Sequence, residues 1–69
     1  MKTGTVRSFD QTKGYGWIVA HDGMSDLFVA KGNIKSDDIR TLTIGSVVTY
    51  ESRFVKEEGL EAFNVSLNR

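Results

Sequence analysis

The amino-acid sequence predicts an all-β protein, a five-stranded antiparallel barrel. Residues 1–69 suffice for a single domain, and a domain of this size buries only a thin core. Short runs of β-branched and aromatic residues alternate with polar turns, glycine occurs seven times, mostly at the borders of these runs, and proline is absent. Short strands without helices must bury one face and leave no open edge, and a small closed barrel meets both conditions.

The first two expected strands flank a polar turn. Residues 3–9 are rich in β-branched side chains and end in an aromatic one, which predicts a strand. The turn covers residues 10–14, and residues 15–20 form the second strand. Because side chains alternate along a strand, one face of the second strand carries Tyr15, Trp17 and Val19, and the other carries Gly16, Ile18 and Ala20.

An Asp-Gly pair, Asp22 and Gly23, favours a hairpin that leads into a third strand at residues 26–30. Its alternation places Leu27 and Val29 on one face and Phe28 and Ala30 on the other. The next segment, 31–43, has no clean period. There we expect one helical turn around Asn33 and Ile34, with Ile39 and Leu42 turned inward.

The last two strands are expected at residues 46–55 and 60–67, joined by a charged hairpin loop at 56–59. Alternation predicts Val48, Tyr50 and Phe54 on one side of the fourth strand and Phe63, Val65 and Leu67 on the apolar face of the fifth. A five-stranded barrel of this size is the OB-fold, in which the second and third strands typically carry the ligand.

Composition excludes several classes of protein. The chain has no cysteine and a single histidine, His21, so it offers no disulfide framework and no cysteine or histidine cluster for a metal. We expect no cofactor and no enzymatic activity, because no catalytic constellation is visible. Neither a signal peptide nor an apolar run long enough to span a membrane is visible, so we expect a cytoplasmic protein. Zero net charge argues against binding nucleic acid mainly by bulk positive charge, but not against a local basic patch combined with stacking.

The aromatic residues of the second and third strands allow two interpretations. If Val6, Ile18, Leu27 and Val29 form the inward face, then Tyr15, Trp17 and Phe28 gather outside beside Lys13. An exposed aromatic patch of this kind marks a contact site, and rings with interleaved cations suit single-strand binding. The alternative is that these rings form the core or a surface for self-association. Phe9, at the end of its strand, fits either the platform or the edge of the core.

The chain resembles the bacterial cold-shock protein family over nearly its whole length. The stretch 13–18, Lys-Gly-Tyr-Gly-Trp-Ile, is similar to the family's first ribonucleoprotein-like motif, usually Lys-Gly-Phe-Gly-Phe-Ile. The stretch 26–30, Asp-Leu-Phe-Val-Ala, is similar to the second, usually Asp-Val-Phe-Val-His. Residues 3–9 resemble the family's opening strand, and further matches are Leu42, Gly45, Val48, Ala62, Asn64 and Val65.

This resemblance implies an OB-fold that binds single-stranded RNA or DNA as an RNA chaperone. It places base-stacking roles on Phe9, Tyr15, Trp17 and Phe28 and phosphate contacts on Arg7 and Lys13. Ser8, Ala30, Lys31 and Ile39 depart from the usual aromatic or histidine residues. At about 1–3 kcal/mol per stacked base, these departures predict a weaker, more salt-sensitive or differently specific binder, with Lys31 compensating in part through phosphate contact.

A second hypothesis keeps the barrel but changes its partner. Neutral charge and the missing aromatics are also compatible with a protein-interaction module. The chain is then a monomer that uses its patch for another protein, or a domain-swapped homodimer with the segment 31–44 as hinge.

Overall fold

The computed structural model describes residues 1–23, 26–35, 42–57 and 59–68. Within this part the regular elements are β1 (Lys2–Asp10), β2 (Tyr15–Ala20), β3 (Asp26–Ala30), the 3-10 helix η1 (Lys31–Asn33), β4 (Val47–Val55) and β5 (Gly59–Leu67). The strands close into a barrel in the order β1-β2-β3-β5-β4. The predicted fold class is confirmed, and the β2 and β3 boundaries agree with those expected from the sequence.

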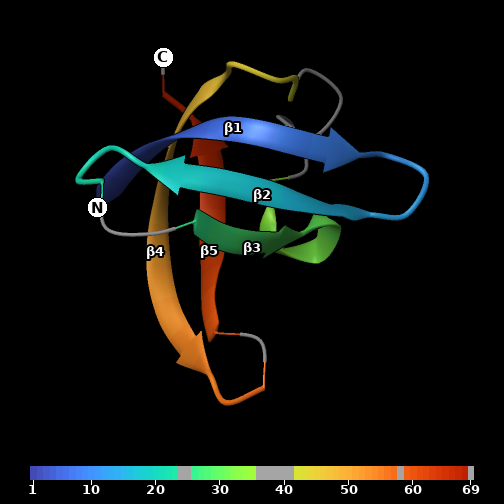
Figure 1. Cartoon of the computed structure of the whole chain (residues 1–69). Coiled ribbons are helices and arrows are strands. Elements are labelled where there is room, and N and C mark those ends of the chain that lie inside the picture. Colours follow the sequence, from blue (N-terminus) through green and yellow to red (C-terminus); the bar gives the residue numbers. More distant parts are fainter. Residues whose placement is uncertain (24–25, 36–41, 58, 69) are drawn as a thin grey trace.

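The barrel consists of a meander and a hairpin. Strands β1, β2 and β3 form an antiparallel sheet, and the β4–β5 hairpin crosses behind it (Figure 1). β4 closes the barrel against β1 antiparallel, whereas β3 and β5 pair in parallel. The sheet is therefore mixed, which corrects the purely antiparallel arrangement that we predicted. The parallel pair arises because β4 follows η1 and forms an antiparallel hairpin with β5, so that β5 runs in the same direction as β3.

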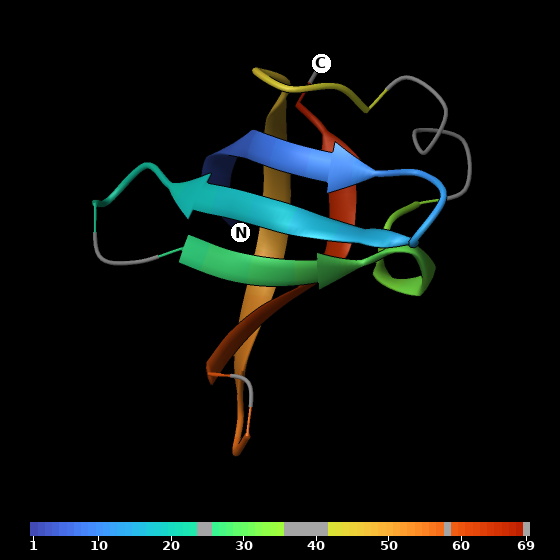
Figure 2. The same ribbon diagram turned by 45° about the vertical axis from the view of Figure 1, so that its right-hand side comes forward.

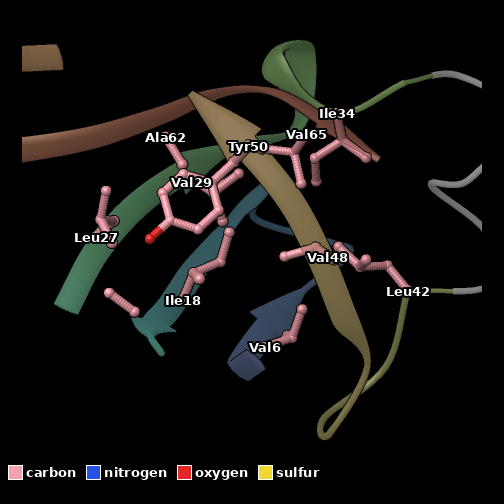
Figure 3. Close-up of a cluster of buried hydrophobic side chains, with 11 residues drawn as sticks. Val6, Ile18, Leu27, Val29, Ile34, Leu42, Val48, Tyr50, Ala62 and Val65 are labelled. Atoms are coloured by element: carbon pink, nitrogen blue, oxygen red, sulfur yellow. The ribbon is translucent and has the colours of Figure 1, made fainter. Parts of the chain in front are cut away.

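Aliphatic side chains and one tyrosine fill the barrel (Figure 3). Those that are at most 2% exposed are Val6, Ile18, Leu27, Val29, Val48, Tyr50, Ala62 and Val65. Leu42 packs at one end with 4% exposure, as predicted, whereas Ile39 lies outside the described residues. The expected helical turn is η1; Ile34 follows it, is buried, and bridges to Val65 of β5.

Gly16 allows β1 and β2 to approach closely. An ideal Cβ on Gly16 would lie 2.2 Å from the carbonyl oxygen of Ser8 and 2.7 Å from the Cα of Phe9. Both atoms belong to backbone, so no side-chain movement relieves the clash. A β-bulge also lies in β1, where the pairing shifts register between Val6 and Ser8 and leaves Arg7 as the extra residue.

A second bulge changes which residues of β5 face inward. The β4–β5 pairing shifts register between Thr49 and Glu51, and Asn64 has a left-handed φ of 51°. As a result Ala62 and Val65, three positions apart, are both fully buried. Phe63 lies outside the core and under the guanidinium of Arg53, so its predicted place on the inward face with Val65 was wrong.

The prediction for Phe54 was also wrong. Phe54 is 73% exposed, although Val48 and Tyr50 of the same strand are buried as predicted. Phe54 pairs with Leu60 near the tip of the β4–β5 hairpin, and that tip extends past the β1–β3 sheet (Figure 2). No core lies beneath a strand at that point, so alternation alone does not bury the ring.

Candidate nucleic-acid interface

The outer face of β2 and β3 carries three aromatic rings. Burial alternates along β2, so Tyr15 and Trp17 point away from the core and are each 38% exposed. In the ladder, Trp17 pairs with Phe28 of β3 and Tyr15 pairs with Ala30. We refer to Tyr15, Trp17 and Phe28 as the aromatic platform. The aliphatic core beneath them excludes the alternative in which these rings form the core.

The three rings of the platform contact one another. The rings of Tyr15 and Phe28 are stacked, with centroids 5.6 Å apart and planes inclined by 27°. Trp17 meets Phe28 edge-on, with a centroid distance of 5.7 Å and an interplanar angle of 79°. Phe28 is half-buried between its two neighbours. It therefore holds the more exposed rings in place and preorganises a surface on which flat groups can stack.

Phe9 has a different environment. It pairs with the inward-facing Gly16, is only partly exposed and packs against the core. Of the two places expected for Phe9, its packing favours the edge of the core. Ser8, its neighbour, pairs with Trp17. The small side chain of Ser8 leaves a shallow hollow beside the indole, lined by Arg7, Ser8, Trp17 and Asp26.

Two lysines lie at the Tyr15 end of the platform. Asp10 fixes the β1–β2 turn: its Oδ1 accepts hydrogen bonds from the backbone N–H groups of Thr12 (2.9 Å) and Lys13 (3.0 Å). The N–H of Lys31 donates to the carbonyl oxygen of Gly14 at 2.8 Å, which brings the start of η1 against the same turn. Lys13 and Lys31 are both exposed, and neither forms an ion pair with any residue that the structure describes.

Arg7 lies at the opposite, Trp17 end and is already paired. Its guanidinium forms an ion pair with the carboxylate of Asp26, the first residue of β3. The two side chains remain 64% and 38% exposed. Asp26 therefore offsets much of the positive charge that Arg7 presents, and the predicted phosphate contact of Arg7 is the weakest of the three on electrostatic grounds.

The described residues contain no group of three or more histidines, cysteines, aspartates or glutamates close enough to hold a metal. His21 is an exposed turn residue, and its Nε2 lies 2.7 Å from the hydroxyl of Thr5. No helix among the described residues is long and apolar enough to cross a membrane.

Sequence reasoning missed one pair near the platform. The guanidinium carbon of Arg53 lies 4.9 Å from the ring centroid of Phe63, a cation–π contact. Arg53 also donates from Nε to Glu61 Oε1 at 2.8 Å. Alternation had placed Phe63 on the apolar face of the fifth strand. The only signal in the sequence was Asn64, a residue type that tolerates left-handed φ and so marks a possible bulge.

Comparison with known proteins identifies the family. The model of the "'Cold-shock' DNA-binding domain" family matches residues 2–68. The chain belongs to this family. It is 42% identical over 65 residues to "Cold shock protein 1" of Lactiplantibacillus plantarum, a match that covers 94% of this chain and 96% of that protein. It is 40% identical over 63 residues to "Cold shock-like protein CspG" of Shewanella violacea, covering 91% of this chain and 89% of that protein. Its membership of the cold-shock family makes this chain a nucleic-acid-binding protein.

A solved structure confirms the cold-shock fold. The structure titled "drosophila Unr CSD456" superposes with a TM-score of 0.77 over 99% of this chain, at 19% sequence identity. This chain spans 26% of the length of that structure. At this identity the likeness concerns the fold, an OB-fold barrel, and it agrees with the barrel described above.

Proposed function

We propose that the cold-shock barrel binds single-stranded RNA or DNA on the aromatic platform and acts as an RNA chaperone. The observation that carries the proposal is the exposed, mutually supporting cluster of Tyr15, Trp17 and Phe28 over an aliphatic core. Every base has a π-face, so stacking on such rings tolerates many sequences. Binding the unpaired form shifts structured RNA toward its open state by mass action, without any chemical step.

Lys13 and Lys31 supply the electrostatic part of this proposal. Both are exposed beside Tyr15 and free of ion pairs with described residues, so they contact the phosphates of a strand that lies across the rings. Arg7 contributes less because of Asp26. Phe9 supports the sheet from the core side and is left out of the stacking set. Ser8 and Ala30 offer no ring, which makes affinity lower and more dependent on salt than it would be with two further rings.

We further propose a non-enzymatic, cytoplasmic protein that acts as a monomer. The alternative, a protein-interaction module or domain-swapped homodimer, predicts size that depends on concentration and no response to nucleic acid. Part of its expected hinge, 31–44, lies outside the described residues. The platform favours the first function because bases, unlike most protein surfaces, present flat faces that complement paired rings and nearby cations.

The test is a titration of Trp17 fluorescence with a short pyrimidine-rich single strand, at low and then at physiological salt. Trp17 is the only tryptophan and lies in the platform, so quenching reports on the proposed contact. We expect saturable quenching that weakens with salt. Tyr15→Ala and Phe28→Ala should each weaken binding about tenfold or more, since stacking is worth about 1–3 kcal/mol per base.

Phe54→Ala is the matched control, because it removes a phenyl ring that is 73% exposed on the β4–β5 hairpin. It should leave the affinity unchanged. Lys13→Gln and Lys31→Gln should each lower the salt slope by about one, and Arg7→Gln by less. Absence of quenching even at low salt, or equal losses in Phe54→Ala and Tyr15→Ala, would refute the platform and direct attention to a protein partner.

A further inference from the structure

A hollow lies beside the platform, between η1 and β5. Its lining includes Asn33, Lys35, Arg53, Phe63 and Asn64, and its volume is about 470 Å³. That volume falls within the range of about 300–1,000 Å³ typical of small-ligand sites. η1 and β5 lie side by side here (Figure 2), and the N–H of Lys35 donates to the carbonyl oxygen of Val65 at 2.8 Å. None of the platform residues takes part in this hollow.

The register of the sheet connects the hollow to the platform. Val29 of β3 pairs with Ala62 of β5, and both side chains are fully buried. One residue further along these parallel strands come Ala30 and Phe63, which leave the core side. Tyr15 pairs with Ala30 from the other flank. Tyr15, Ala30 and Phe63 therefore follow one another across β2, β3 and β5, and the small Ala30 leaves the line between the two rings open.

The charges around the hollow suit a phosphate and a base. Lys35 and Arg53 line it, and no described aspartate or glutamate does. Among the described residues, the carboxylates that contact the lining are engaged with the protein: Glu61 binds Arg53, and Glu51 Oε2 accepts a hydrogen bond from the Asn64 side chain at 2.7 Å. The Arg53 side chain is 53% exposed above Phe63, so its guanidinium plane is open to a further flat group.

We propose that Arg53 and Phe63 form a second nucleotide subsite, in which a base stacks on the Arg53–Phe63 pair and its phosphate lies near Lys35. The subsite takes a nucleotide of the same single strand that crosses the platform, so the inference rests on the proposed function. It extends the binding track from β2 and β3 onto β5. It also compensates for the ring that Ala30 lacks, at a position one strand further round the barrel.

The test compares two pyrimidine-rich strands, of about four and about eight nucleotides, lengths within the range of about 4–16 nucleotides that an OB-fold covers. The short strand occupies the platform alone, and the long one reaches Phe63. Phe63→Ala and Arg53→Gln should weaken binding of the long strand about five- to tenfold and that of the short strand less than twofold. Tyr15→Ala should weaken both, and Phe54→Ala neither.

Two further measurements test the second subsite independently of Phe63→Ala. If Phe63→Ala does not fold, Phe63→Leu retains an apolar side chain without the flat ring and should show the same length-dependent loss. In the wild type, the amide resonances of Lys35 and Asn64 should shift with the long strand and stay unchanged with the short one. Shifts of these amides that are equal for both strands would contradict the subsite.

The possible outcomes distinguish failure of the second subsite from failure of binding on the aromatic platform. If the wild type binds both strands and Phe63→Ala and Phe63→Leu equal the wild type on each, the second subsite is refuted and the platform stands. If the wild type binds neither strand, both proposals fail. If Phe63→Ala abolishes self-association in sedimentation but leaves long-strand binding intact, the hollow is a protein interface and the subsite is likewise refuted.

Discussion

Strands β2 and β5 both place aromatic rings on the outside of the barrel, yet they do so by different rules. In β2 burial alternates at every residue, so Tyr15 and Trp17 follow directly from the period of two. In β5 the buried residues Ala62 and Val65 are three apart, because a bulge at Asn64 interrupts the alternation. Phe63 alternates with Ala62 and so lies outside, and the bulge that follows it places Val65 on the opposite, inward face.

The difference shows what each strand contributes. β2 lies in the middle of the β1–β3 meander, and although β1 carries a bulge, β2 itself alternates at every residue, so its rings are spaced by the pleat. β5 pairs in parallel with β3 on one side and antiparallel with β4 on the other. A bulge increases the local twist and bends the strand, and this bend allows β5 to pair with β3 on one side and with β4 on the other. The regular strand carries the platform, and the bulged strand adds a ring at its border.

The largest expected effect falls on β2. Gly16→Ala places a methyl group against the backbone of β1, where the contacts to the Ser8 oxygen and Phe9 Cα would be 2.2 and 2.7 Å. We expect a loss of about 3 kcal/mol in the free energy of unfolding. Urea denaturation measures the loss. Gly32→Ala is the control, because no atom lies within 4 Å of its added Cβ, and it should change stability by about 0.5 kcal/mol or less.

If Gly16→Ala and Gly32→Ala are equally stable, the close approach of β1 and β2 does not depend on glycine. In that case the spacing of the platform rings would have another origin. A stable Gly16→Ala protein that has lost quenching by nucleic acid would instead show that β2 had shifted its register.

A smaller effect is expected at the bulge in β5. Asn64 has φ 51°, a conformation that a β-branched residue adopts only under strain. Asn64→Val should cost about 2 kcal/mol, combining this strain with the lost hydrogen bond to Glu51. Asn64→Gly keeps the conformation accessible and should cost less than about 1 kcal/mol. Thermal unfolding of the two variants measures the difference in stability. Equal losses of stability would mean that the left-handed backbone conformation at residue 64 does not determine which residues are tolerated there.

The smallest effect is expected at Tyr50, the β4 residue opposite the bulge. Burial raises the pKa of the Tyr50 phenol, and the carboxylate of Asp22 raises it further. The native state then keeps this proton at pH values where the unfolded chain, with an ordinary pKa of about 10, has lost it. Stability from this source is complete below about pH 10 and falls as the pH rises toward the native pKa.

Tyr50→Phe removes that dependence. Urea denaturation between about pH 9 and 11 should show a steeper decline for the wild type than for the variant, by at most about 1.4 kcal/mol per pH unit. All other groups are common to the two proteins and cancel in the comparison. Parallel declines would mean that the phenol titrates alike in the folded and unfolded states.

Much of the platform was predictable because it depends on local order. Alternation in β2 and β3 placed the aliphatic residues on one face and Tyr15, Trp17 and Phe28 on the other. Motif similarity identified the same three aromatic residues. The ion pair of Arg7 with Asp26 was not predictable, since it joins residues 19 positions apart on strands that are not neighbours. The prediction that Phe54 faces inward was wrong for a related reason. Its exposure depends on where the barrel ends, and alternation along a strand does not indicate that position.

By itself the sequence determined the number and order of the strands, the turns and the division of β2 and β3 into an aliphatic and an aromatic face. These features depend on residues close together in the chain, through pleat geometry and turn conformation. Only the tertiary structure decided the parallel pairing of β3 with β5, the bulges and the place of Phe63 beside Arg53. Closing a barrel imposes twist and register on strands distant in sequence, and it is this closure that brings Phe63 into line with the platform.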